Sequence, residues 1–534
     1  MNAFLRRALL GGAAAAMLAA PAAAAAAPEP PMTLPRDAIA SSVPAAHGSW
    51  IVGARPGAAA RGAARRFGAR HLGPAGTGGY AVVPGRARAF AAALERRGLL
   101  VYAQPNTLAE PHRAVPPDPL SAPPDNWRDV VADPSLVPPA VDASSPLIAL
   151  VDFQLDPAHA EWQGGNTTTL PRFPVTDSHG TATASVAAAP ANGIGILGVW
   201  PGARALNVPL PEQSTCEHSA NQVATAIERG AAVINMSYGF HGLCYPEYVA
   251  LQFAVARGIV PVAAAGNEFA EGNPLEFPAS LPHVLTVAAV GPDLQTSYFS
   301  NANAAIDLSA PGESIMTAVP PAHDGDGVAD GYERQHGTSF AAPMVAAAVA
   351  WVRAARPRLT SDQVNQAVRL SARDVGPDGW DPDTGFGVLS VGRALKIPPV
   401  PADPSEPNDD MVWVDGGAFG RPDRLLYAGG RRARLTGLLD AFEDPADVYR
   451  IRVRGHTRKR ISADPAGTDN VALRVYRGAA KSLRARPLKS SARRGSRTEA
   501  VTLGNRSGRA RVYYVAVHVQ GRSDLDAAYT LRVG

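Results

Sequence analysis

Cysteine is scarce in this sequence, and so are aromatic side chains and long apolar runs. Only two of the 534 residues are cysteines, and aromatic residues make up 6% of the chain. In an exported chain two cysteines form one disulfide by default, here Cys216–Cys244, and neither lies in a pattern that supports a catalytic cysteine. No nucleic-acid-binding motif or aromatic-rich platform is present, which disfavours nucleic acid as a partner. Beyond the N-terminal stretch no run is long and apolar enough to cross a bilayer, so we expect no membrane span.

Residues 1–27 have the composition of a signal peptide. Arg6 and Arg7 form a positive n-region, an apolar stretch follows, and a row of alanines ending at Ala27 offers cleavage points. The alternative is an uncleaved membrane anchor, but the apolar stretch is short and interrupted, which favours cleavage. The paired arginines also permit twin-arginine export. We therefore expect a secreted, extracellular protein with a bacterial-type export signal.

Charge is sparse overall and strongly segregated along the chain. The formal net charge is +4, and charged residues make up 18%. Residues 28–115 hold 11 Lys/Arg and 4 Asp/Glu (net +7), residues 116–400 hold 13 and 28 (net −15), and residues 421–534 hold 25 and 10 (net +15). Because opposite charges steer and hold partners, we expect the basic N-terminal region to dock on the acidic middle.

The chain is too long for one hydrophobic core and predicts three or four domains. Residues 49–111 predict a strand–helix–strand–helix–strand order. Between residues 147 and 400, short and almost continuous apolar runs alternate with helices, which is typical of parallel strands buried on both faces of an α/β layered domain. A Pro/Asp-rich linker at 401–417 precedes short alternating strands at 418–534, which predict a β-sandwich.

Three residues have the character of a hydrolytic site. Ser339 precedes a helix of small residues, where N–H groups and the helix dipole favour developing negative charge. His179 also precedes a helical run, and Asp152 ends an apolar strand. Alone, Ser339 is better explained as an ordinary N-cap. A serine becomes a useful nucleophile when a histidine accepts its proton and a carboxylate orients that histidine, so the three together indicate nucleophilic hydrolysis.

Four segments, HGTATAS, INMSYG, AAAGNE and GTSFAAPMVAAA, occur in this order along the chain. They resemble the signature segments of subtilases, the subtilisin-like serine proteases, over about residues 115–400. The resemblance implies a three-layer α/β fold with a parallel sheet, a serine endopeptidase working through an acyl-enzyme, and no catalytic cofactor. It assigns Asp152, His179 and Ser339 to the catalytic triad and the Asn267 amide to the oxyanion hole.

One departure from the family pattern lies at the aspartate. The family usually has Asp-Thr/Ser-Gly, and this chain has Asp152-Phe153-Gln154. The carboxylate is kept, but the strand end must hold a larger side chain where glycine is usual. The departure is the support for an alternative function, an inactive protease scaffold that acts as a surface-binding or adhesion protein through the basic C-terminal domain.

The flanking regions also resemble known domains. Residues 48–111 resemble a subtilase propeptide of the ferredoxin-like α+β type. The resemblance implies a propeptide over residues 28–113 that acts as a chaperone and inhibitor in cis, and a peptidase domain over 114–400. Residues 418–534 resemble a prepeptidase-type C-terminal β-sandwich through EPND, DPADVYRIRVRG and the closing strands. We expect a monomer whose partners are protein or peptide substrates and its own propeptide.

The resemblance also predicts how substrate binds. An extended peptide is expected to add a strand beside Ser237-Tyr238-Gly239, next to a P1 pocket bounded by Ala265 and Gly266. Alignment with the family places Glu276 at the base of this pocket, where a carboxylate would favour Arg or Lys at P1. The alternative for Glu276 is a surface-loop glutamate. The two cysteines each follow a predicted strand on this side, so their disulfide would brace loops beside the cleft.

Structural calcium is expected at two places. The first follows from the resemblance to the family's calcium loop in ANGIGILG. The second is the acidic loop DGDGVADG, whose carboxylates alternate as hard cations prefer, and its alternative is a solvated acidic turn. The candidate ligands are Glu161, Asn192, the carbonyls of Ile194 and Ile196, and Asp118 at the first site, and Asp324, Asp326 and Asp330 at the second.

Overall fold

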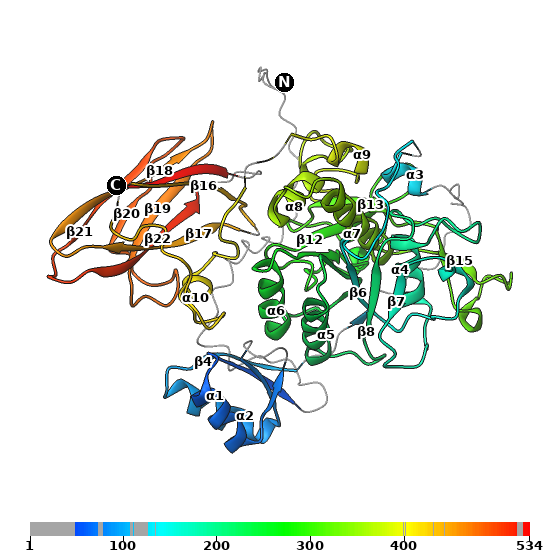
Figure 1. Ribbon diagram of the computed structural model, residues 1–534, viewed down its shortest axis with the longest axis horizontal. Coiled ribbons are helices and arrows are strands. Elements are labelled where there is room, and N and C mark those ends of the chain that lie inside the picture. Colours follow the sequence, from blue (N-terminus) through cyan, green and yellow to red (C-terminus); the bar gives the residue numbers. More distant parts are fainter. Residues whose placement is uncertain are drawn as a thin grey trace, which may run out of the picture.

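Three folded bodies follow one another along the chain in the computed structural model (Figure 1). An N-terminal α+β domain, a central α/β domain and a C-terminal β-sandwich are arranged around a common junction. The structure describes residues 49–72, 78–106, 110–111, 127–133, 135–398, 400, 402–430, 432–442, 444–520 and 527–534. The predicted signal peptide (1–27) and the candidate ligand Asp118 lie outside the described residues.

The N-terminal domain packs two helices on one face of a four-stranded sheet. Its elements are β1 (Trp50–Ala54), α1 (Ala58–Phe67), β2 (Arg70–Leu72), β3 (Gly79–Val82), α2 (Pro84–Glu95) and β4 (Leu100–Pro105). The strand order is β2-β3-β1-β4, with antiparallel pairs throughout. Phe90 and Leu94 of α2 fill the core under the helices, whereas Ile51 and Tyr102 on the other face pack against the central domain. The strand–helix–strand–helix–strand order predicted for residues 49–111 is present, and β2 is an additional strand between α1 and β3.

The central domain is built on a seven-stranded parallel sheet. Its strands are β6 (Ile148–Asp152), β7 (Thr167–Thr169), β8 (Ala205–Pro209), β9 (Val233–Met236), β11 (Val260–Ala264), β12 (Leu285–Val290) and β13 (Leu308–Pro311). They lie in the order β13-β12-β11-β9-β6-β8-β7. The apolar runs LIALVDF, ALNVPL, AAVINMSYG, GIVPVAAAG and VLTVAAV, which the sequence predicts as strands, are confirmed as β6, β8, β9, β11 and β12. Every residue of these five strands is buried because both faces of the sheet are covered. The edge strands β7 and β13 were not predicted.

Helices cover both faces of this sheet. The helices of the domain are α3 (Trp127–Val131), α4 (His179–Ala188), α5 (Cys216–Glu228), α6 (Tyr245–Val255), α7 (Thr338–Ala355), α8 (Ser361–Leu370) and α9 (Val391–Ala394). Shorter elements are the 3-10 turns η2 (Ala160–Trp162), η3 (Phe269–Glu271) and η4 (Pro321–His323), the hairpin β14 (Ile315–Ala318) and β15 (Tyr332–Gln335), and the pair β5 (Glu110–Pro111) and β10 (Tyr238–Gly239). One face packs on α4 and α7, the other on α5 and α6, which makes the predicted three layers.

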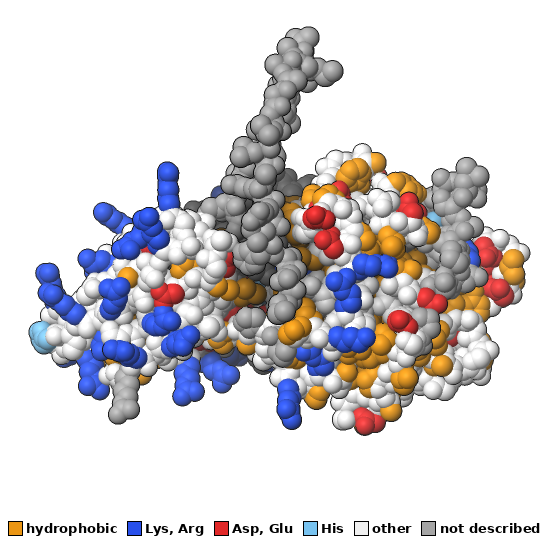
Figure 2. Space-filling view, turned by 90° about the horizontal axis from the view of Figure 1, so that it is seen from above, with side chains coloured by type: hydrophobic (Ala, Val, Ile, Leu, Met, Phe, Trp, Pro, Cys, Tyr) orange, Lys and Arg blue, Asp and Glu red, His pale blue; other side chains and the backbone are white. Residues whose placement is uncertain are grey.

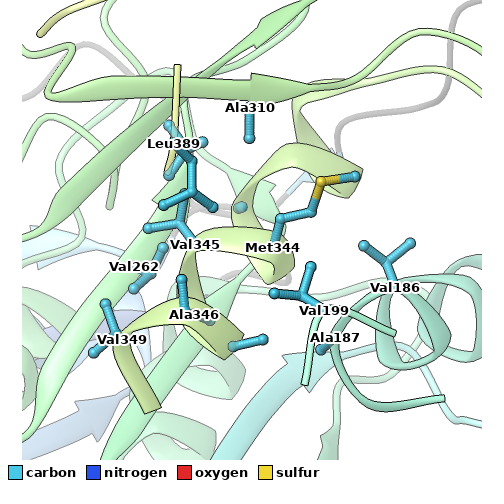
Figure 3. Packing of buried hydrophobic residues seen from close by; sticks show 14 of the residues in the cluster. Val186, Ala187, Val199, Val262, Ala310, Met344, Val345, Ala346, Val349 and Leu389 are labelled. Carbon is cyan, nitrogen blue, oxygen red and sulfur yellow. The ribbon is translucent and has the colours of Figure 1, made fainter. Parts of the chain in front are cut away.

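Helix α7 is the centre of the larger core. Figure 3 shows Met344, Val345, Ala346 and Val349 of this helix surrounded by side chains from α4, β11 and β13. By length and composition this helix could cross a membrane. The prediction that no run beyond the N-terminal stretch is long and apolar enough to do so is therefore wrong by this criterion. However, 83% of its most apolar window is buried inside the protein, which is the environment of a core helix.

The C-terminal body is a sandwich of two four-stranded antiparallel sheets. The strands are β16 (Ala433–Leu439), β17 (Ala446–Val453), β18 (Thr457–Pro465), β19 (Val471–Arg477), β20 (Lys489–Ser491), β21 (Glu499–Asn505), β22 (Arg511–Val519) and β23 (Ala527–Val533). The sheet orders are β16-β23-β18-β21 and β17-β22-β19-β20. The expected sandwich is confirmed, and the apolar alternation of the sequence predicts β17, β19, β21, β22 and β23. Strands β16, β18 and β20 were not predicted.

The segment predicted as a linker (401–417) is packed between the domains where the structure describes it. It contains the short helix α10 (Met411–Val414). The Trp413 ring packs edge-on against Tyr248 of α6, with ring centroids 5.4 Å apart. Met411 and Val414 on the same helix pack with Tyr476 of the sandwich. The segment therefore joins the sandwich to the central domain through buried apolar side chains.

Candidate active site

The predicted catalytic residues gather at the carboxyl edge of the parallel sheet. Asp152 is the last residue of β6, His179 is the first residue of α4, and Ser339 lies in the first turn of α7. In open α/β sheets this edge is where strand ends and helix N-termini converge on a ligand. All three side chains are buried, with 3%, 6% and 0% exposure respectively.

Asp152 holds His179 through a short hydrogen bond. The Nδ1 atom of His179 lies 2.6 Å from Oδ1 of Asp152. The same carboxylate accepts hydrogen bonds from the Phe153 amide (2.7 Å, Oδ1) and the Thr183 hydroxyl (2.9 Å, Oδ2). These donors fix the carboxylate, and the carboxylate in turn fixes the orientation of the imidazole.

Ser339 and Asn267 meet at the N-terminus of α7. The imidazole of His179 lies 5.9 Å from the Phe340 ring, centroid to centroid, which brings it to the first turn of that helix. The Oδ1 atom of Asn267 accepts hydrogen bonds from the amide (2.9 Å) and the hydroxyl (3.0 Å) of Thr338. This fixes the orientation of the Asn267 amide group beside Ser339, with Nδ2 as its donor atom.

The unusual Phe153-Gln154 pair is accommodated by hydrogen bonds. The Phe153 carbonyl accepts from Nδ2 of Asn207 at 2.9 Å. The Gln154 side chain accepts from the amides of Arg172 and Phe173 and donates to the Thr169 hydroxyl at 2.7 Å. The Phe153 ring lies edge-on to His179 with centroids 6.2 Å apart. The larger side chains therefore support the site and leave the Asp152–His179 bond intact.

The predicted substrate strand is paired with the end of the N-terminal domain. Strand β10 contains Tyr238 and Gly239 and forms an antiparallel pair with Glu110–Pro111. Ser237 precedes it and donates its hydroxyl to the Ser339 carbonyl at 2.8 Å. Backbone at 110–111 thus lies where an added substrate strand is expected.

Glu276 lies in the interior of the protein, not in an exposed loop. Its side chain is 1% exposed. Gly266 has a φ of +107°, and a Cβ added there would lie 2.9 Å from Cγ of Glu276, so the glutamate packs against the predicted pocket wall that Ala265 and Gly266 form. The Nδ1 atom of His241 lies 2.7 Å from Oε1 of Glu276. Sequence reasoning missed His241, because it sits in a loop that no motif covers.

The predicted disulfide is present between Cys216 and Cys244. Cys216 opens α5 and Cys244 is the N-cap of α6. The bridge joins the N-termini of two adjacent helices. The N-terminal domain contacts these same helix ends through Gln104 and Asn106. The disulfide therefore braces the surface on which that domain docks.

The residues expected at the first calcium site are engaged with one another. The Glu161 carboxylate accepts hydrogen bonds from the Tyr332 hydroxyl (2.7 Å) and the Ile196 amide (3.1 Å). The side chain of Asn192 donates to the Glu161 carbonyl, and its Oδ1 accepts from the Ile194 amide. Both hydrogen bonds to the carboxylate go to Oε2, and Oε1 of Glu161 has no hydrogen-bond partner among the described residues. Calcium there stays a prediction.

The three aspartates of the second predicted site cap turns between β14 and β15. Asp326 accepts from the Val328 amide at 2.8 Å, Asp330 from the Tyr332 amide and Asp324 from the Gly331 amide. In the described part of the chain, the groups of ionisable side chains close enough to share an ion do not include them or Glu161. Calcium in this loop also stays a prediction.

A cluster of buried acids that sequence reasoning missed lies where the central domain meets the sandwich. We call Asp403, Glu406, Asp409, Asp444 and Asp447, with His283, the junction acid cluster. Its ligand atoms form two overlapping groups of four, each within 4.8 Å. Burial first, and then the neighbouring carboxylates, raise the pKa values of Asp403, Glu406 and Asp444 well above the ordinary range.

Several oxygen atoms of the junction acid cluster have no hydrogen-bond partner among the described residues. These atoms are Oδ1 of Asp403, Asp444 and Asp447 and Oδ2 of Asp409. The four aspartates are at most 8% exposed. His283 of the central domain lies 3.0 Å from Oδ1 of Asp409 and 3.4 Å from Oε2 of Glu406. The cluster has the hard oxygen donors that Ca²⁺ prefers.

A parallel three-layer fold with an aspartate, a histidine and a helix-terminal serine at its carboxyl edge defines a serine hydrolase of the subtilisin type. The model of the subtilase family matches residues 131–387. The chain is 32% identical over 273 residues to subtilisin amylosacchariticus from Bacillus subtilis subsp. amylosacchariticus, covering 49% of this chain and 69% of that one. The chain therefore belongs to the subtilase family of serine endopeptidases.

A second relative has a similar architecture. Fervidolysin from Fervidobacterium pennivorans is 30% identical over 314 residues, which are 52% of this chain and 44% of fervidolysin. The chain thus spans less than half the length of that curated relative. The crystal structure of fervidolysin, described as a keratinolytic enzyme related to subtilisin, covers 86% of both chains with a TM-score of 0.57. At 16% identity this likeness shows the fold.

Proposed function

We propose that this protein is a secreted serine endopeptidase in which Asp152, His179 and Ser339 form the catalytic triad. The observation that carries the proposal is the 2.6 Å contact between Asp152 and His179 at the start of α4, close to the N-terminus of α7 that bears Ser339. The alternative of an inactive adhesion scaffold is not favoured, because the altered Phe153-Gln154 pair leaves that contact in place.

In the proposed reaction the Ser339 hydroxyl attacks the scissile carbonyl carbon while Nε2 of His179 accepts its proton. The Asp152 carboxylate stabilises the resulting imidazolium. The Asn267 amide and the Ser339 backbone N–H donate hydrogen bonds to the oxyanion. His179 then protonates the leaving amine, which leaves an acyl-enzyme on Ser339. Water activated by His179 hydrolyses this ester and restores the serine.

A fluorophosphonate that labels activated serines tests the assignment directly. Labelling of the processed protein is expected at Ser339 and is expected to be lost in His179→Ala, because the serine then lacks its base. Peptide mapping by mass spectrometry identifies the labelled residue. A label on another serine, or equal labelling of His179→Ala, would contradict the assignment.

We propose that residues 28–113 form a propeptide that inhibits the enzyme until it is cleaved. Gln104 accepts a hydrogen bond from the Tyr245 amide at 2.6 Å and donates to the Leu243 carbonyl at 3.0 Å. Asn106 accepts from the Glu217 amide at 3.0 Å. Both side chains thus cap helix N-termini, which supports docking at α5 and α6. The pairing of 110–111 with β10 supports inhibition, because it occupies the expected substrate strand.

We propose that Glu276 selects basic residues at P1. Its buried carboxylate packs against Gly266, and the bridge between Phe240 and Phe277 holds the end of the Ser237-Tyr238-Gly239 strand beside the same segment. The carboxylate also lies 2.7 Å from His241, and a P1 Arg or Lys that reaches it would gain a charge-assisted hydrogen bond. A P1 profile from a peptide library tests this proposal.

We propose that the junction acid cluster holds a structural cation, with Ca²⁺ as the best fit. Four buried carboxylates with unpartnered oxygen atoms are the donor set that a divalent ion satisfies. No catalytic step involves this site. An ion there would tie three parts of the chain together, since the cluster joins His283 of the central domain, the 402–410 segment and the β16–β17 region of the sandwich.

A further inference from the structure

The acidic and basic side chains of the sandwich are distributed differently between its interior and its surface. Among the described residues of 421–534, no Asp or Glu is in the exposed class, and Asp444, Asp447 and Glu499 are buried. Most Lys and Arg side chains of the same region are exposed. Figure 2 shows the result as blue side chains over the sandwich half, whereas red and blue mix over the other half. The surface is more cationic than the net charge of +15 implies.

A groove runs across one end of this surface. It has a volume of about 940 Å³ and lies between the β19–β20 edge and the β21–β22 turn. Four exposed cations line it: Arg477 ends β19, Lys489 opens β20, Arg506 follows β21 and Arg511 opens β22. No carboxylate lines the groove. The ion pairs of this region use other cations: Arg532 with Asp464, Lys481 with Asp415 and Arg369 with Asp440.

The chemistry of the groove narrows the class of its partner. The large hydrophobic side chains exposed in the described part of the chain all lie outside residues 421–534, so the sandwich offers no apolar anchor for a bilayer. The aromatic ring in the groove, Tyr513, is 8% exposed, which is too little to stack on nucleic-acid bases. Four cations along the groove instead suit a linear chain that carries negative charge along its length.

We propose that this groove binds a linear acidic polysaccharide, with carboxylate or sulfate groups contacting Arg477, Lys489, Arg506 and Arg511. Arginine forks match the planar geometry of carboxylate and the oxygens of sulfate. Such binding would hold the enzyme on an anionic matrix while the active site, on another domain, stays accessible. The proposal does not depend on the triad assignment.

The test compares two variants that lose the same charge. The groove variant carries Arg477→Ser, Lys489→Ser, Arg506→Ser and Arg511→Ser. The control carries Arg421→Ser, Arg424→Ser, Arg432→Ser and Arg434→Ser, all of them exposed. Arg421 and Arg424 precede the residues Leu426 and Tyr427 that pair with β17, and Arg432 and Arg434 lie at the start of β16. Strands β17 and β16 are the sheet edges opposite β20 and β21. Both are made in full-length Ser339→Ala protein to prevent self-digestion, and thermal melts check that both fold.

Binding is measured by fluorescence anisotropy with labelled dextran sulfate and with labelled polygalacturonate, and uncharged dextran is the blank. The groove variant is expected to bind about tenfold more weakly than the control, because four exposed charge contacts are lost together. Its affinity should also depend less steeply on salt, because fewer counterions are released. The sulfate and carboxylate arms show which group is preferred.

Three results would overturn the proposal. Equal losses in the two variants would show attraction to net charge without a site. Failure of the parent to bind either polymer in about 0.15 M salt would show that the groove does not bind acidic polysaccharides at physiological ionic strength. The third result is that the parent binds duplex DNA or phosphatidylserine vesicles more tightly than either polysaccharide and that the groove variant loses this binding. It would assign the groove to a different class of partner.

Discussion

Removing divalent cations should destabilise the sandwich and its junction with the central domain. Without an ion, the junction acid cluster brings four carboxylates with unpartnered oxygens into the interior. An ion present at about 100 times its dissociation constant stabilises the folded state by about 2.7 kcal/mol. For a domain of this size that corresponds to a fall in Tm of about 5–15 °C when a chelator removes the ion. The proposed catalytic residues lie elsewhere, so the domain that holds them should melt with a smaller change.

The assay is calorimetry of the Ser339→Ala protein with Ca²⁺ or with EDTA. Asp447→Asn should lower Tm in Ca²⁺ and abolish the difference between Ca²⁺ and EDTA, because a ligand oxygen is replaced. Asp464→Asn is the matched control, since Asp464 lies on the sandwich and pairs with Arg532 away from the cluster. It should keep the full calcium effect. Identical melting of the parent in Ca²⁺ and EDTA would refute the cation site.

Further changes test the pocket, the buried acid beneath it and the docking of the N-terminal domain. Glu276→Gly should move P1 preference in a peptide library from basic towards large apolar residues, and an unchanged profile would remove its assigned role. Burial raises the pKa of Glu247 to about 7, so the free energy of unfolding should fall as pH rises from about 4.5 to 7. Glu247→Gln should flatten this pH dependence in urea titrations, and its side-chain oxygen can still accept the hydrogen bond from the Tyr238 hydroxyl. Asn106→Ala removes the acceptor of the Glu217 amide and should speed release of the cleaved N-terminal domain about tenfold, as measured by gel filtration. An unchanged release rate would show that other contacts hold the domain.

The fold was predictable where the apolar pattern is strong. The runs at β6, β8, β9, β11 and β12 are buried on both faces, so their composition alone identifies them. The strands that escaped prediction have mixed composition. Strand β7 is the short, half-exposed run of three threonines at 167–169, and β18 begins with alternating exposed basic side chains that hide its inward-facing Ile461 and Ala463.

The candidate site was predictable only where a local motif marks it. His179 and Ser339 lie in such motifs, whereas the junction acid cluster draws on segments that are far apart in the sequence, near residues 283, 403–409 and 444–447. No local spacing shows that these meet. The Glu161 region shows the same limit, because the Tyr332 hydroxyl that donates to its carboxylate comes from a hairpin 171 positions away.

Self-processing of the purified precursor tests the central claim most directly. The precursor and its Ser339→Ala variant are incubated side by side, and intact mass and casein hydrolysis are followed with time. The triad assignment predicts that the parent releases its N-terminal domain and then digests casein, whereas the variant stays intact and inactive because its nucleophile is missing. Equal processing and equal casein hydrolysis by the two proteins would contradict the assignment.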